Sequence, residues 1–414
     1  MTILTIIGTR PEAIKMAPVL RELARHTGRV RSLLCLTGQH RDLVAPILDL
    51  FGLRADFTLQ VMRPGQSLAQ LTAALCSQLD PVIEEASPDW ILGQGDTTTA
   101  LVAALAACYQ RVSFGHVEAG LRTGDKFSPW PEELNRRVAD VAADLLFAPT
   151  AQARRNLLRE GCPADRIHVT GNTVVDAVRE IAARPPPVCL GRPEFSWASP
   201  ERSQRLVLVT VHRRENIGGP LREICGAVKE LAARFPDGRV QFVLPVHPNP
   251  EVRLPLGKLL GEVPHVRLIE PLDYHAMVHV MKRASLILTD SGGIQEEAPS
   301  LGVPVVVLRE RTERPEGVAA GLVRLAGTRR AAIVEAALCV LTAPPDELPP
   351  RRIAAFKANP YGDGRAAERI VSRLLGPLRR RSAAAGTPAP SQRGSGRISA
   401  GPSATIRRRQ LTNR

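Results

Sequence analysis

Short runs of strand-forming residues alternate with longer helical patterns through most of this chain, and no other feature limits its fold as strongly. In the first half the strand-like runs are residues 3–7, 31–36, 90–92, 112–117 and 145–148, and helical patterns begin near Pro11, Thr97 and Glu132. Strands that alternate with helices pair in parallel through right-handed crossovers. The pattern therefore predicts an α/β protein with a doubly wound parallel sheet and helices on both faces.

The alternation breaks at Pro185-Pro186-Pro187 and then restarts. In the second half the strand-like runs are residues 205–211, 240–246, 266–268, 286–289 and 303–308, and helical patterns lie near 221–234, 274–283, 294–300 and 366–375. No internal sequence repeat is visible. We expect two Rossmann-like, doubly wound domains, residues 1–178 and 179–358, that face a cleft. Ligands bind to such sheets beyond the carboxyl ends of the strands.

The formal net charge of +14 raises the question of nucleic-acid binding. Residues 377–414 contain nine arginines and no acid, so residues 1–376 carry only 14 − 9 = +5. This tail is rich in Ala, Ser, Gly and Pro and is predicted to be a disordered appendage. Aromatic residues make up only 4% of the chain, too few for rows of rings that stack on bases. We expect an anionic small molecule as the ligand, and no nucleic-acid partner beyond what the basic tail attracts.

Cysteine usage and hydropathy indicate a soluble, cytoplasmic protein. The seven cysteines are widely spaced and form no Cys-x-x-Cys pair, so neither a disulfide framework nor a cysteine-based zinc site is expected. No His-Glu-x-x-His motif occurs, and no metal is predicted. No uncharged apolar run approaches the ~18 residues of a membrane span, and the N-terminus lacks the pattern of a signal peptide.

Two helix starts of the first domain carry charged groups. In Gly8-Thr9-Arg10-Pro11-Glu12-Ala13-Ile14-Lys15 the glycine permits a tight turn and the proline suits the first helical position. Arg10 and Lys15 then lie beside a helix N-terminus, which attracts anions, so we favour a phosphate site over two merely exposed cations. Acids precede bases in Glu132-Glu133-Leu134-Asn135-Arg136-Arg137. Helix-dipole and paired-charge effects explain that pattern without any function.

Two strand ends of the first domain carry acids. Gly93-Gln94-Gly95-Asp96-Thr97-Thr98-Thr99 resembles a dinucleotide fingerprint, but a threonine stands at the third glycine position. Asp96 is then either an acid at the strand end or a helix N-cap. In the next strand, alternation puts His116 and Glu118 on one face. The alternative to a functional Glu118 is a strand-end salt bridge, with Arg122 as one candidate partner.

The second domain repeats this arrangement with cations and glycines. His212-Arg213-Arg214 follows its first strand and suits a diphosphate, and His212 could protonate a departing phosphate. Later, Ser291-Gly292-Gly293 stands between a strand and a helix, where backbone amides can cradle a phosphate. Glu297 lies four residues into that helix and could accept both hydroxyls of a ribose. Arg314 follows the strand-like run 303–308 and is expected to place a cation at the cleft.

Taken together, these segments resemble the non-hydrolysing UDP-N-acetylglucosamine 2-epimerase family from residue 1 to about residue 376. The matching segments are 8–19, 37–40, 94–99, 115–123, 131–136, 171–177, 212–218, 247–250, 290–302, 313–316 and 359–362. The resemblance implies a GT-B-type fold with the substrate between two domains, and a C-terminal helix, 359–376, that crosses back to the first domain. Family members interconvert UDP-N-acetylglucosamine and UDP-N-acetylmannosamine without metal or other cofactor, usually as homodimers, for surface polysaccharide synthesis.

The resemblance also implies roles for individual residues in a route that eliminates UDP to give 2-acetamidoglucal and then adds it back. The acid and base candidates are Asp96, Glu118 and Glu132, with Arg136 beside them. The departing diphosphate is stabilised by Arg10, Lys15, His212 and Arg314. Phosphate and ribose are held by Ser291, Gly292, Gly293 and Glu297.

Some alternatives stay open at this point. Gln39 and His40 match part of a second, activating UDP-N-acetylglucosamine site, but Gly65 departs from the arginine that some members place in that site. A hydrolysing epimerase would release UDP and free N-acetylmannosamine, and a GT-B glycosyltransferase would need an acceptor. The sequence does not assign the proton to one of the three carboxylates.

Overall fold

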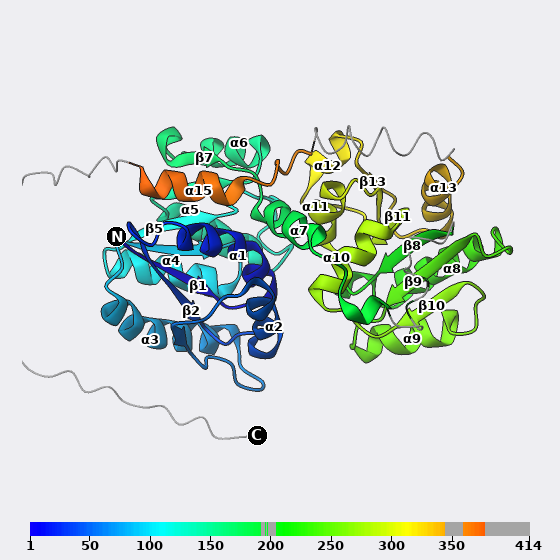
Figure 1. The fold of residues 1–414 in the computed structure, drawn as a ribbon, viewed down its shortest axis with the longest axis horizontal. Helices are drawn as coiled ribbons and strands as arrows, with labels where there is room; N and C mark the ends of the chain where they lie inside the picture. Colours follow the sequence, from blue (N-terminus) through cyan, green and yellow to red (C-terminus); the bar gives the residue numbers. More distant parts are fainter. Residues whose placement is uncertain (192–194, 196, 198–203, 344–358, 377–414) are drawn as a thin grey trace, which may run out of the picture. The chain divides into compact units, whose positions relative to one another are not determined.

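The computed structural model describes residues 1–191, 195, 197, 204–343 and 359–376 (Figure 1). Residues 1–375 form one compact unit that contains two parallel sheets. The predicted Arg-rich tail, residues 377–414, and the predicted boundary near residue 358 lie outside the described residues.

The first sheet has seven parallel strands in the order β3-β2-β1-β4-β5-β6-β7. The strands are β1 Thr2–Ile7, β2 Arg31–Leu36, β3 Phe57–Thr58, β4 Trp90–Gln94, β5 Ser113–Val117, β6 Leu145–Ala148 and β7 Ile167–Val169. The helices between them are α1 Arg10–Ala24, α2 Arg41–Phe51, α3 Leu68–Ala86, α4 Thr98–Tyr109, α5 Glu132–Ala142, α6 Ala151–Arg159 and α7 Thr173–Ala183.

The second sheet has six parallel strands in the order β10-β9-β8-β11-β12-β13. The strands are β8 Arg205–Thr210, β9 Val240–Pro245, β10 Val266–Ile269, β11 Leu286–Thr289, β12 Val305–Val307 and β13 Val323–Leu325. The helices are α8 Gly219–Ala233, α9 Pro250–Leu260, α10 Tyr274–Arg283, α11 Gly292–Ser300, α12 Pro315–Ala319 and α13 Arg330–Leu341. The predicted α/β fold class is confirmed.

Most strand residues are apolar and buried because both sheet faces are covered. In β1, Ile3 and Ile7 belong to one apolar cluster, while Leu4 and Ile6 belong to another on the opposite face. This two-residue alternation between two buried faces is typical of parallel sheets under helices.

Each sheet has a point where its strand order reverses, and these points position the cleft. In the first sheet β1 lies between β2 and β4, and in the second β8 lies between β9 and β11. Chain segments that leave two neighbouring strands there diverge to opposite faces and leave a crevice. The segments after β1, β4, β8 and β11 contain most of the predicted site residues.

The last described helix, α15 (Ala366–Leu375), packs on the first domain against α1 and α7 (Figure 1). The Asp176 carboxylate accepts hydrogen bonds from the amides of Ala366 and Ala367, at 3.2 and 2.9 Å. Arg29 donates to the last carbonyl of this helix, at Leu375. Among the described residues, no helix combines the length and apolar composition needed to cross a membrane.

Candidate active site

A cleft of about 610 Å³ lies between the two sheets, beyond the carboxyl ends of β1, β4, β8 and β11. It is lined from both sides. The twelve predicted catalytic and substrate-binding residues all line it: Arg10, Lys15, Asp96, Glu118, Glu132, Arg136, His212, Ser291, Gly292, Gly293, Glu297 and Arg314.

Gln39 and His40, predicted for a second site, do not line this cleft. The Gln39 side chain accepts a hydrogen bond from Thr99 Oγ1 at 2.9 Å, and burial lowers the pKa of His40. A regulatory site at these residues stays a prediction.

Glu118 follows β5 in a left-handed backbone conformation, with φ of +68°. Such a conformation is uncommon for a residue with a side chain and is retained where the surroundings fix it. Here its side chain is held from two sides, because Oε2 accepts from Lys15 Nζ at 2.5 Å and from Asn172 Nδ2 at 3.2 Å. Arg122 is not its partner, since Arg122 binds Asp140 and Glu160, but the alternative of a strand-end salt bridge is met by Lys15.

Lys15 is buried in α1 and lies between two carboxylates. Its Nζ contacts Glu118 at 2.5 Å and lies 3.5 Å from Glu296 Oε2. Burial would lower the pKa of Lys15, but the two carboxylates outweigh it and the pKa is raised. Lys15 is therefore a buried cation that lines the cleft.

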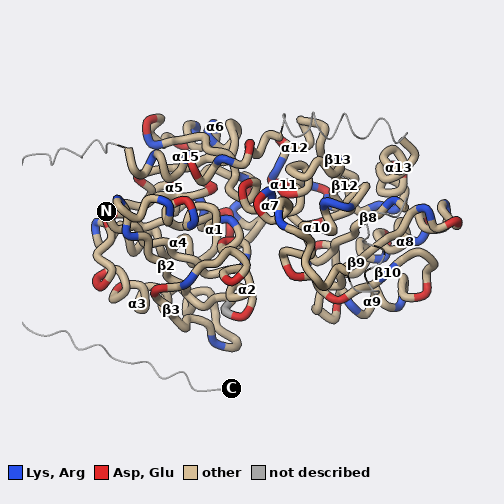
Figure 2. Tube along the Cα trace, in the orientation of Figure 1, with Lys and Arg blue, Asp and Glu red and all other residues tan. Residues whose placement is uncertain are grey.

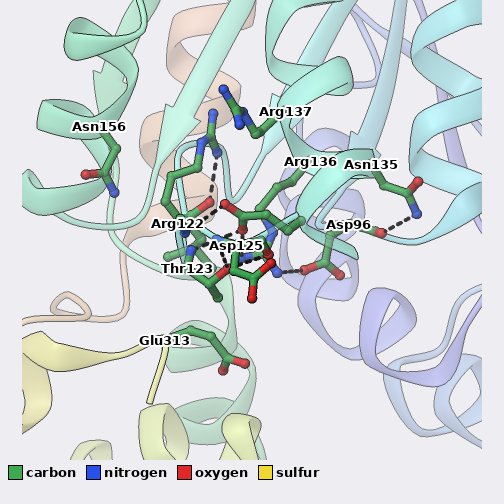
Figure 3. A network of polar contacts seen from close by, with 12 residues as sticks. Asp96, Arg122, Thr123, Asp125, Asn135, Arg136, Arg137, Asn156 and Glu313 are labelled. Atoms are coloured by element: carbon green, nitrogen blue, oxygen red, sulfur yellow. Dashed lines mark hydrogen bonds and ion pairs between the residues drawn. The ribbon is translucent and has the colours of Figure 1, made fainter. Parts of the chain in front are cut away.

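Asp96 is a half-buried acid that follows β4 and faces α5 (Figure 3). Its Oδ2 accepts from Arg136 Nη2 at 2.5 Å, and its carbonyl accepts from Asn135 Nδ2 at 2.9 Å. The N-cap alternative for Asp96 is wrong, because Thr97 caps α4 through a hydrogen bond from the Ala100 amide.

Glu132 opens α5 and projects towards the same space. Its Oε2 is buried and accepts no hydrogen bond from the described residues. Burial raises the pKa of Glu132, and the neighbouring Asp96 raises it further, against smaller effects of Arg136 and Arg213. A raised pKa favours the protonated form of a carboxyl group, which is the form that an acid catalyst uses.

A buried network behind these acids escaped the sequence interpretation. His116 is fully buried, with Nδ1 2.7 Å from Asp140 Oδ1 and Nε2 2.8 Å from the Gly95 carbonyl. A carbonyl only accepts, so Nε2 carries a proton. Burial lowers the pKa of His116, but Asp140 and the Gly95 carbonyl outweigh it and the pKa is raised. His116 thereby fixes the turn that presents Asp96.

In the second domain, a buried aspartate organises the loop after β8. The Asp290 carboxylate accepts from the amides of His212 and Arg213, at 3.0 and 2.9 Å, and from Asn216 Nδ2 at 3.0 Å. The His212 ring stacks on His247 with centroids 5.9 Å apart. Burial lowers the pKa of His212, and the nearby Arg213 adds to this against the effect of Asp290.

The Ser291-Gly292-Gly293 segment forms the start of α11 at the cleft. A Cβ added at Gly292 would lie 2.7 Å from Arg314 Nη1, so a larger residue would displace the Arg314 guanidinium. The Ser291 amide donates to Thr289 Oγ1 at 2.9 Å, which leaves the amides of Gly292 and Gly293 for a phosphate.

Glu297 lies further along the same helix and accepts from the Tyr274 hydroxyl at 3.1 Å. Burial raises the pKa of Glu297 to about 7, although the Tyr274 hydrogen bond opposes this. Across the described part of the chain, no group of His, Cys, Asp and Glu could hold a metal ion.

The chain is similar to known proteins of one family. Residues 21–375 match the family model described as UDP-N-acetylglucosamine 2-epimerase. The chain is 48% identical over 377 residues to the UDP-N-acetylglucosamine 2-epimerase of Yersinia pestis, covering 90% of this chain and 98% of that protein.

Solved structures of the same family are also similar to this chain. The Neisseria meningitidis UDP-GlcNAc 2-epimerase bound to UDP-GlcNAc is 45% identical, with a TM-score of 0.80, over 91% of this chain and all of that one. A glycotransferase of kitacinnamycin, 17% identical with a TM-score of 0.59, shares the fold alone over 90% of this chain and 99% of that one.

Proposed function

This chain belongs to the UDP-N-acetylglucosamine 2-epimerase family, and from that membership we propose how its cleft works. The protein is an isomerase that interconverts UDP-N-acetylglucosamine and UDP-N-acetylmannosamine. The proton on carbon 2 of the sugar has no adjacent carbonyl to stabilise a carbanion, so direct abstraction is difficult. In the proposed route a carboxylate removes this proton as the C1–O bond to UDP breaks, which gives 2-acetamidoglucal. UDP then adds back at carbon 1 while a proton reaches carbon 2 from the opposite face.

The observation that carries this proposal is that three acids and several cations line one cleft. Asp96, Glu118 and Glu132 come from the first domain and suit proton transfer around the hexose. On the diphosphate side, charge-assisted hydrogen bonds can stabilise the leaving group. These groups are Arg10, Lys15, His212, Arg314, the Ser291 hydroxyl and the amides of Gly292 and Gly293, while Glu297 accepts from the ribose. Arg136 keeps Asp96 in place.

An exchange experiment tests the route. Purified protein mixed with UDP-N-acetylglucosamine in deuterated water should yield the manno epimer with deuterium at carbon 2. Free UDP should stay at the level of a trace. Stoichiometric UDP with free N-acetylmannosamine would instead indicate a hydrolysing enzyme, and UDP release only with an acceptor would indicate a glycosyltransferase.

We also propose a cytoplasmic homodimer that supplies activated sugar for polysaccharide synthesis. Tyr109, Leu134 and Val141 are 76%, 50% and 81% exposed on the contacting helices α4 and α5. Apolar side chains gathered on neighbouring helices suit contact with a second copy of the chain. The seven free thiols suit a reducing compartment. Light scattering on the wild-type protein and on Val141→Lys tests the dimer, since the variant should be monomeric.

A further inference from the structure

Glu296 is a buried carboxylate in α11 to which the sequence interpretation gave no role. Its side chain is 1% exposed and contacts cations from both domains. Oε1 accepts from Arg314 Nε at 2.7 Å, and Oε2 lies 3.5 Å from Lys15 Nζ. Acidic and basic positions lie side by side where α7 and α11 meet (Figure 2).

Arg314 is held by two carboxylates in one orientation. Nε donates to Glu296, and Nη1 donates to Glu313 at 2.9 Å. Nη2 makes no hydrogen bond to the residues that the structure describes. The guanidinium lies beside Gly292, at the N-terminus of α11, where a phosphate would be bound.

We propose that Glu296 is a positioning residue that orients Arg314 so that its free Nη2 meets the diphosphate. This inference rests on the proposed function, because it assigns Arg314 to the leaving group. A guanidinium is planar, so a hydrogen bond at Nε fixes the plane in which the other two nitrogens lie. Without this hydrogen bond, only Glu313 would hold the long, flexible side chain of Arg314.

The alternative is that Glu296 only balances buried positive charge. The two roles predict opposite effects on UDP, which is an anion. A carboxylate that acts through charge alone opposes UDP binding, so its neutralisation should strengthen binding. A carboxylate that orients Arg314 supports UDP binding, so shortening its side chain should weaken binding even though the charge remains.

Two substitutions separate these roles. Glu296→Gln keeps an oxygen within reach of Arg314 Nε and removes the charge. Oε2 accepts no hydrogen bond in the described structure, so the amide nitrogen that replaces it breaks none and removes only the 3.5 Å ion pair with Lys15. Glu296→Asp keeps the charge and withdraws the oxygens by one methylene group.

The readout is the UDP Kd from isothermal titration calorimetry. Glu296→Gln should stay within threefold of wild type or bind more tightly, whereas Glu296→Asp should bind at least about tenfold more weakly, as expected for losing one charge-assisted hydrogen bond. Melting temperatures show that each variant is folded. Glu230→Asp, which shortens a carboxylate paired with Arg330 away from the cleft, should not change the Kd.

A second arm tests whether Glu296 acts through Arg314. In an Arg314→Ala background, Glu296→Asp should cause no further loss of UDP affinity. An Asp variant that binds UDP like wild type, or a loss that persists without Arg314, would overturn the proposal. Wild-type protein that neither binds UDP nor turns over UDP-N-acetylglucosamine would instead overturn the proposed function, so the two failures are distinguishable.

Discussion

Each half of the cleft contains one buried aspartate, but the two aspartates accept hydrogen bonds from different kinds of groups. In the first domain Asp140 is 2% exposed and accepts from the charged side chains of His116 and Arg122, as well as from the Gly120 amide. In the second domain Asp290 is fully buried and accepts from two main-chain amides and the Asn216 amide.

The difference indicates that the two halves of the cleft have different roles. Charged side chains that hold one another set the places of Asp96 and Glu118, whose protonation must be controlled. Asp290 is held mainly by neutral amides, with His212 Nδ1 3.3 Å away, and these amides shape the loop that carries His212 and Arg213 to the cleft. Substitutions of the acids in the first half should therefore lower turnover, and substitutions in the second half should weaken UDP binding.

Among the substitutions that test this comparison, Glu118→Gln has the largest expected effect. Removal of a group that transfers the carbon 2 proton should lower kcat about 10³-fold, within the range for general acid–base catalysis. UDP binding should be no weaker than in wild type, because the change removes a negative charge near the diphosphate. Steady-state kinetics and calorimetry on the same preparation measure both. A variant with ordinary kcat and weakened UDP binding would reverse the assignment of the two halves.

Gly292→Ala examines the second half with a smaller expected effect. The added Cβ would lie 2.7 Å from Arg314 Nη1 and 3.3 Å from Arg213 Nη2, so both guanidinium groups must shift. We expect UDP to bind about 30-fold more weakly, equivalent to losing roughly one charge-assisted hydrogen bond. In deuterated water, product formed at saturating substrate should still carry deuterium.

Gly257→Ala is the matched control for that variant. Gly257 lies in α9, and nothing lies within 4 Å of a Cβ added there. Its UDP affinity should equal that of wild type. Equal UDP affinity in Gly292→Ala as well would show that the start of α11 does not shape the anion site.

The sequence predicts part of the site from topology, because parallel strands end at one edge of a sheet, whereas the roles of Glu132 and Arg136 came from the family resemblance. Arg10, Asp96 and Glu118 follow β1, β4 and β5, so strand order alone brings them together. Short edge strands such as β3, with two residues, have too little pattern to detect.

The supporting groups were not predictable in the same way. Asp140 lies 24 residues beyond His116, near the end of α5, and nothing local distinguishes it from any helical aspartate. Glu296 precedes Glu297 directly, yet the two carboxylates serve different neighbours because consecutive helical side chains point about 100° apart. Such pairings depend on tertiary packing, which periodicity does not encode.

The smallest effect concerns Glu297 in the UDP-binding half, where burial raises the pKa to about 7 from an ordinary value of 4.5. The folded protein therefore keeps this proton up to a higher pH than the unfolded chain does. Its contribution to stability is full below about pH 4.5 and is lost as pH rises through about 7, for a total of about 3 kcal/mol. The free energy of unfolding of wild type, relative to Glu297→Gln, should fall over that interval.

Binding should follow the opposite trend, because only the ionised carboxylate can accept from both ribose hydroxyls. A group with a pKa of about 7 is roughly one-tenth ionised at pH 6, so UDP should bind up to about tenfold more weakly at pH 6 than at pH 8. The other ionisable groups of UDP and of the protein are the same in Glu297→Gln. The ratio of the wild-type and Glu297→Gln Kd values, measured at each pH, therefore isolates Glu297. A ratio that does not change between pH 6 and 8 would mean that the second half recognises the nucleotide through its amides and cations alone, without a titrating carboxylate.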